Sequence, residues 1–213
     1  MTTFRFKTSQ VLQGDFQLKS LNLLVAFQVN CPGCFIYALP LAAKLHHEYG
    51  DRLNILGLST AFEDFDLNTA EYTQCLIETG EIVGATKLYF SHQGQKSYTV
   101  PIHFPVAFDD VGSSQDLFDD ADIEHICCLT PSFPQMDEEK QQRVRKRVQQ
   151  VLLTRPIAGY TFSVNQFQGT PSWVLFDGDS NILAQWFGHK SEAEIMAMID
   201  RLSESTGESQ AIA

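Results

Sequence analysis

The hydrophobic pattern changes period most sharply around a Cys-Pro-Gly-Cys sequence. Before it, Leu21 to Val29 is a nearly continuous apolar run, too short to span a membrane and typical of a central strand in a covered sheet. After it, apolar residues recur every three or four positions from Phe35 to Tyr49, as on one face of a helix. Pro40 lies inside this period without ending it, so we expect a kinked helix.

The rest of the chain alternates strand and helix patterns. A strand over 53–58 would pair in parallel with the first one through the intervening helix. Two strands separated by a turn rich in Asp, Gly, Ser and Asn predict an antiparallel hairpin near the C-terminus. The further predicted elements are a weak edge strand over 4–11, a helix capped by Asn68 and ending near Thr79, a short strand within 101–108, a helix over 136–153, hairpin strands over 173–176 and 182–187, and a last helix from a Ser191–Glu194 capping box to about Leu202.

Charge is distributed unevenly along the chain. The segment 97–139 holds ten carboxylates and no Lys or Arg, and Lys140 to Arg147 then carries five cations. These cations fall in the helix predicted over 136–153, whose first turn is acidic, as the helix dipole favours. We interpret this helix as amphipathic with a solvated charged face; the alternative is a docking face for an acidic partner.

Composition limits the classes of function. The chain has 213 residues with 44% hydrophobic content, which suits one domain over 1–213. A net charge of −11 argues against nucleic acid as a partner. We see no apolar run long enough for a membrane span and no export signal. Five cysteines without such a signal indicate a reducing, cytoplasmic location, where paired cysteines are more often catalytic than structural.

The two cysteines of the turn are the main candidate catalytic residues. At the start of a helix, unpaired backbone N–H groups and the dipole stabilise a thiolate and lower its pKa. Cys31 would be the exposed attacking sulfur, and Cys34, one turn later, would resolve the mixed disulfide. Pro32 suits a first helical turn, and Gly33 allows the backbone of another chain to approach.

Other interpretations of the cysteines stay open. The pair could be half a zinc site, a structural disulfide or inert core cysteines, although no second pair stands at ligand spacing. Cys127 and Cys128 could relay electrons or, like Cys75, simply be buried. Metal-ligand residue types crowd the segment 119–128 without the spacing of a known site, so no metal ligand is assigned. His46 and His47 are interpreted as surface or packing residues.

Three segments together resemble the thioredoxin superfamily, in its TlpA-like and peroxiredoxin-like (AhpC-TSA-like) branch: LLVAFQVNCPGC, DFQLKSLNLLVAF and GTPSWVLFDGDSNILAQWFG. The resemblance implies an α/β thioredoxin-like fold, with a mixed sheet of about five strands flanked by helices. It also implies that Pro171 is cis and faces the cysteines, and that the Thr170 backbone pairs with an extended substrate. The spacing is longer than a minimal thioredoxin needs, so residues 80–156 would form a mostly helical inserted lid over or beside the active site, and 203–213 a disordered tail.

The sequence departs from that family at several positions. Asn30 stands where a tryptophan is common, and Val25 and Tyr37 replace acids that assist the second cysteine in relatives. Proton transfer would then fall to water, Glu63 or Asp64. A glutamine, rather than the threonine of peroxiredoxins, precedes Cys31 by three residues, which disfavours peroxidase chemistry.

These observations predict a thiol–disulfide oxidoreductase, a net reductase in a cytosol. Its partners would be a protein or small-molecule disulfide and an external dithiol reductant, and it would need no cofactor beyond its own Cys31–Cys34 disulfide. The alternative is a non-catalytic thioredoxin-fold module for binding or redox sensing. Metal handling at the thiols is a weaker third hypothesis.

Overall fold

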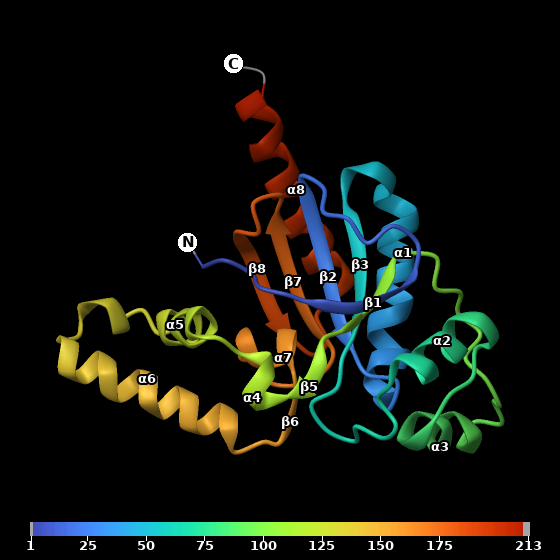
Figure 1. Ribbon diagram of the computed structural model, residues 1–213. Helices are drawn as coiled ribbons and strands as arrows, with labels where there is room; N and C mark the ends of the chain where they lie inside the picture. Colours follow the sequence, from blue (N-terminus) through green and yellow to red (C-terminus); the bar gives the residue numbers. More distant parts are fainter. Residues whose placement is uncertain (1, 211–213) are drawn as a thin grey trace.

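The long apolar run of the sequence forms the middle of a six-stranded sheet (Figure 1). The computed structural model describes residues 2–202 in full and the helical backbone of 203–210. In the sheet order β1-β4-β3-β2-β7-β8, strands β2, β3 and β4 are parallel, while β1, β7 and β8 pair antiparallel with their neighbours. A separate pair, β5 and β6, lies at one end of this sheet. The predicted α/β fold is therefore confirmed, with one more strand than expected.

The elements follow the predicted alternation closely. The strands are β1 Thr8–Gln13, β2 Leu21–Phe27, β3 Asn54–Ser59, β4 Val106–Asp109, β5 Val111–Ser113, β6 Ile157–Gly159, β7 Ser172–Asp177 and β8 Ile182–Phe187. The helices are α1 Leu39–Tyr49, α2 Ala70–Thr79, α3 Gly84–His92, α4 Ser114–Leu117, α5 Asp120–Cys128, α6 Glu138–Leu153, α7 Tyr160–Val164 and α8 Glu192–Gln210, with a π-helical turn at Cys34–Ala38 and 3₁₀ turns at Gly50–Arg52 and Phe133–Gln135.

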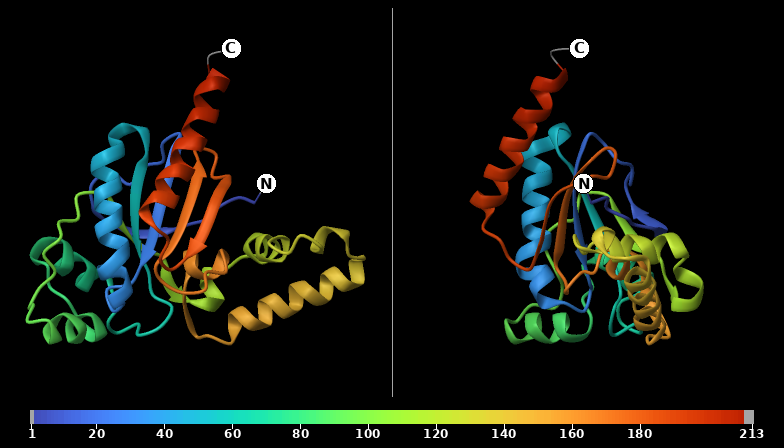
Figure 2. Two further views of the ribbon diagram at one scale, coloured as in Figure 1. Left: turned by 180° about the vertical axis from the view of Figure 1, so that it is seen from behind. Right: turned by 90° about the vertical axis from the view of Figure 1, so that its left-hand side faces the viewer.

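Two apolar layers cover the two faces of the sheet. One face packs on α1, α2, α3 and α8, and Figure 2 shows α1 and α8 together on that side. The other face is covered by α7, which contributes Phe162, and by aromatic residues from the N-terminal segment, among them Phe4. Side chains of a strand alternate between the two faces of the sheet, and both faces are covered here. The strand β2 is therefore buried throughout and needs apolar residues at nearly every position.

The predicted insertion, 80–156, divides into two parts around a strand of the central sheet. Its middle contains β4, which pairs with both β3 and β1. Before β4, α3 packs beside the Cys-Pro-Gly-Cys turn; after it, α4, α5 and α6 (residues 114–153, here called the arm) extend sideways from the end of the sheet (Figures 1 and 2). The helical content was predicted, and α3 lies beside the active site as one of the two expected positions, but the arm extends away from the sheet and covers neither cysteine.

Several local predictions change in detail. Pro40 is accommodated by the π-helical turn before it, in which the N–H of Leu39 reaches back five residues to the carbonyl of Cys34. The cap of α2 is Thr69, whose hydroxyl accepts from the N–H of Tyr72, and not Asn68.

The last helix also differs from its prediction. Its Ser191–Glu194 capping box is present, with mutual backbone contacts. It continues to Gln210 instead of ending near Leu202, so the predicted tail over 203–213 is helical through Gln210, and residues 211–213 lie outside the described residues. Within the described part of the chain, no helix combines the length and apolar character that crossing a bilayer would require.

Candidate active site

The two predicted catalytic sulfurs lie where β2 passes into the first helix. Helical backbone begins at Pro32, and the N–H of Cys34 donates to the carbonyl of Cys31 at 3.0 Å. Cys31 is half-buried at the surface, whereas Cys34 has 0% exposure. A Cβ placed on Gly33 would meet nothing within 4 Å, so packing does not require glycine there. The open space beside it leaves room for another chain.

The surroundings of the two thiols separate their pKa values. A hydrogen bond from Cys34 is the largest influence on Cys31 and, with the Thr170 hydroxyl and the N–H groups of Cys34 and Gly33, lowers the pKa of Cys31 to about 6 against the effect of burial. Burial, followed by the adjacent Cys31, raises the pKa of Cys34 well above its ordinary value. The outer sulfur is therefore a thiolate at neutral pH while the inner one stays protonated.

The Thr-Pro sequence meets the cysteines, although it follows them by more than 130 positions. The Thr170–Pro171 peptide bond is cis, and Cys31 in its protonated form donates to the Thr170 carbonyl at 3.4 Å, across 139 residues of sequence. The Thr170 hydroxyl donates to the Gln28 side chain at 3.1 Å, and the Gln28 amide donates to the Glu63 carbonyl at 3.4 Å. Gln28 thus joins the Thr-Pro loop to the loop after β3, beneath the sulfurs.

Asn30 fixes the other side of the turn, a role that the sequence did not indicate. Its side-chain oxygen accepts from the N–H of Ala85 at 2.5 Å, and its amide donates to Asp64 at 2.8 Å. Its own backbone N–H donates to Asn68 at 3.0 Å. Because the first turn of α3 has no cap within its own segment, Asn30 supplies it. A Cβ on Gly84 would collide with the Asn30 side chain, so these two residues depend on each other.

The two carboxylates suggested as proton acceptors, Glu63 and Asp64, make no contact with the sulfurs that the structure describes. Asp64 accepts from Asn30, and Glu63 contributes its backbone carbonyl to Gln28 and Asn68; no contact joins either carboxylate to a sulfur within the part of the chain described here. Asp109 is a fully buried acid at the same edge of the sheet. It lies two residues after Ala107, which packs in the layer opposite α1, so it faces away from Cys34.

The other cysteines lie away from this pair. Cys127 packs in a small apolar cluster inside the arm, whereas Cys34 belongs to the layer between α1 and the sheet. Cys128 is exposed, and no disulfide joins any of the five cysteines. Among the described residues, no three His, Cys, Asp or Glu side chains gather as a metal site would need. The alternative of an electron relay through Cys127 or Cys128 finds no contact with the turn among the described residues.

Comparison with known proteins identifies the fold. No family model matches the sequence, and no curated protein matches it either. Among solved structures, a thioredoxin-like superfamily protein is similar at 21% identity and a TM-score of 0.55, over 95% of this chain and 97% of its own. A thiol-disulfide isomerase from Corynebacterium glutamicum is similar at 19% identity and a TM-score of 0.56, over 94% of each chain. The chain has a thioredoxin-like fold, as predicted from its motifs.

Proposed function

We propose that this protein is a thiol–disulfide oxidoreductase. The Cys31 thiolate attacks one sulfur of a substrate disulfide, forming a mixed disulfide and releasing the other substrate sulfur as a thiolate, which takes a proton from water. Cys34 then loses its proton and attacks Cys31. The substrate leaves as a dithiol, having gained two electrons, and the chain holds a Cys31–Cys34 disulfide. An external dithiol then reduces the Cys31–Cys34 disulfide and is itself oxidised to a disulfide.

The main support for this proposal is that the two sulfurs differ in exposure and in pKa. A thiolate that is half-exposed and a protonated thiol that is fully buried, hydrogen-bonded to it, form an ordered attacking and resolving pair. The cis Thr170–Pro171 bond beside Cys31 leaves the backbone before Pro171 available to pair with an extended substrate. Pro32, with no N–H, and Gly33, with open space beside it, would form the opposite side of that contact.

The direction of electron transfer between the cysteine pair and its substrate depends on how strongly the reduced, dithiol form of the pair is stabilised. Thioredoxin combines an attacking-thiol pKa of about 7 with a potential of about −270 mV, and each unit of pKa corresponds to about 30 mV. A pKa of about 6 for Cys31 stabilises the reduced form further, so we expect a potential less negative than that of thioredoxin. In a reducing cytoplasm, the location that we propose from cysteine usage, net transfer is then reduction of the substrate.

Reduction of insulin disulfides tests this function directly. We expect turnover by the wild-type protein with dithiothreitol, loss of at least a thousandfold in Cys31→Ser, and little change in Cys128→Ser, an equally conservative change at an exposed cysteine in the arm. A wild-type protein that titrates two reactive thiols at the turn yet reduces neither insulin nor a small aromatic disulfide would instead be a binding or redox-sensing module.

A further inference from the structure

The side-chain amide of Gln28 is buried beneath the cysteine turn and has defined partners on both of its ends. The residue is 2% exposed. Its carbonyl oxygen accepts from the Thr170 hydroxyl at 3.1 Å, and its NH₂ group donates to the Glu63 carbonyl at 3.4 Å. A buried amide has lost its hydrogen bonds with water, so each polar atom needs a partner in the chain. The Thr170 hydroxyl is the donor that satisfies the oxygen of Gln28.

The same hydroxyl is also a hydrogen-bond partner of the two sulfurs. It favours the thiolate of Cys31 and the thiolate of Cys34. A threonine hydroxyl has one proton and donates one hydrogen bond at a time, so Gln28 and the two sulfurs compete for it. Because a thiolate is charged, it is a stronger acceptor than a neutral amide. The hydroxyl therefore turns to whichever sulfur carries the charge.

We propose that the Thr170 hydroxyl is a movable donor and that Gln28 is the positioning residue that holds it whenever neither sulfur is charged. The inference rests on the proposed function, because disulfide exchange is what moves the charge between the sulfurs. Before attack, the hydroxyl donates to the Cys31 thiolate, and in the mixed disulfide it returns to Gln28. When Cys34 loses its proton to water, the hydroxyl donates to the Cys34 thiolate until the internal disulfide forms. The hydroxyl keeps its own proton throughout, and only its hydrogen bond changes.

This arrangement provides what the inner sulfur needs in order to react. Cys34 must become charged before it attacks, and burial opposes that charge. The carboxylates of Glu63 and Asp64 make no contact with it that the structure describes. The Thr170 hydroxyl and the backbone N–H of Gln28 both favour its thiolate. The side chain of Gln28 limits this effect, because its buried oxygen loses its donor each time the hydroxyl turns away.

Reaction with dithiobis(nitrobenzoate), a small aromatic disulfide, follows the two sulfurs separately in a stopped-flow instrument. Attack by Cys31 releases one thionitrobenzoate, and attack by Cys34 on the mixed disulfide releases the second. All proteins carry Cys75→Ser and Cys128→Ser, because these two thiols are half-buried and exposed and would also react. Iodoacetamide alkylation of the same proteins as a function of pH gives the pKa of Cys31.

The two side chains should have opposite effects. Thr170→Val removes the donor, so the Cys31 pKa should rise by about one unit and the second release should slow about fivefold. Gln28→Met removes the competing oxygen at nearly the same volume, so the pKa should fall by about half a unit and the second release should quicken about twofold. In a protein that already carries Thr170→Val, Gln28→Met should change neither quantity. Thr170→Ser, which keeps the hydroxyl, should behave as the parent.

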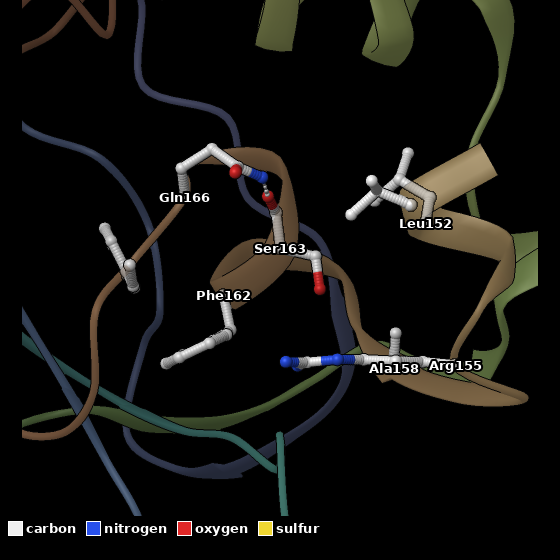
Figure 3. A pocket seen from close by; sticks show the side chains of 8 residues that line it. Leu152, Arg155, Ala158, Phe162, Ser163 and Gln166 are labelled. Carbon is white, nitrogen blue, oxygen red and sulfur yellow. Dashed lines mark hydrogen bonds between the residues drawn. The ribbon is translucent and has the colours of Figure 1, made fainter. Parts of the chain in front are cut away.

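Two control variants remove similar groups elsewhere. Asn54→Leu removes a buried amide at the start of β3, at the opposite end of the sheet from the cysteines. Ser163→Ala removes a hydroxyl of α7 that lines a separate cavity of about 150 Å³ between α7 and the end of α6 (Figure 3). Neither variant should change the Cys31 pKa or the second release.

The outcomes separate this inference from the proposed function. An unchanged Cys31 pKa in Thr170→Val would overturn the movable donor. A higher pKa in Gln28→Met, or a shift that persists when Thr170→Val is also present, would show that Gln28 acts through packing and would overturn its role. If the parent protein releases only one thionitrobenzoate from the turn, Cys34 does not resolve the mixed disulfide, and the proposed function itself is wrong.

Discussion

The cysteine turn and the arm begin at the same end of the sheet, but they are held in opposite ways. The turn is part of the main core, and Cys34 and Phe35 are almost completely buried in it. The arm has one small cluster of its own, around Cys127, and meets the body through a second one, in which Leu117 and Ile126 pack with Tyr160, and through Asp122, which accepts from Arg5 and Tyr160. The difference shows that the fold fixes the sulfurs through many contacts and attaches the arm through few.

The largest expected effect comes from removing the inner sulfur. Cys34→Ala deletes the strongest influence that lowers the Cys31 pKa, so this pKa should rise by about two units, which is about a fiftyfold loss of thiolate at pH 6. Iodoacetamide alkylation rates measured from pH 4 to 10 would give the pKa of Cys31 in the wild type and in the variant. An unchanged profile would mean that the backbone N–H groups, and not Cys34, stabilise the thiolate.

The next effect tests the joint between the sheet and α7. Asp109 accepts from the Thr60 hydroxyl at 2.7 Å and from the N–H of Thr161 at 3.0 Å, yet burial raises its pKa from 3.8 to about 6. A carboxyl whose folded-state pKa is raised contributes stability that is complete below pH 4 and is lost as pH rises through 6. Ionisation of Asp109 should therefore lower the free energy of unfolding by about 2–3 kcal/mol as pH rises from 4 to 7.

Urea unfolding of the wild type and of Asp109→Asn at both pH values would measure this cost. The amide can keep both hydrogen bonds without a charge, so the variant should lose that part of the pH dependence. Parallel pH profiles for the two proteins would show that the acid is not the source.

A smaller effect is expected from loosening the arm. Although burial alone would raise it, the pKa of Asp122 is lowered because Tyr160, the N–H of Asp119, Arg5 and Lys7 favour its charged form. Asp122→Asn should cost about 1–2 kcal/mol, discounted because the Arg5 side chain is 35% exposed. Hydrogen exchange should quicken in α5 and α6, while the Cys31 alkylation profile stays the same. A shift in that profile would show that the arm and the turn are coupled.

The smallest expected effect concerns the cap of α3. Asn30→Ala removes the acceptor for the Ala85 N–H and should cost about 1 kcal/mol. Asn30→Asp, which keeps the acceptor but places a charge beside Asp64, separates the lost cap from simple truncation. Thermal unfolding of both variants measures the effect, and equal stability of Asn30→Ala and wild type would contradict the cap.

The sequence predicted elements whose pattern is local. The strand at Leu21, the turn and the helix beyond it were correct because one stretch of chain carries both periods. Asn30 was missed because its partners are distant in sequence and no period marks them. The short strand predicted within 101–108 contains Pro105; in the structure β4 starts directly after this proline, has four residues and lies inside the sheet.

The pairing of Thr170 with Cys31 could be predicted only by resemblance, since nothing local connects residues 139 positions apart. The direction of the arm was beyond prediction for a different reason. The helix α6 has an apolar stripe but no buried residue, so its pattern fits a helix on a small cluster as well as one covering the active site.

The complete burial of Cys34 imposes an order of events on the molecule. No reagent in solution touches that sulfur, so it reacts only with a group already attached to its neighbour. Each chain therefore reacts with one alkylating or oxidising molecule at this turn, and the reaction is at Cys31. The inner sulfur is spared from irreversible oxidation. Oxidation of the pair and its reduction therefore both begin at the Cys31 sulfur.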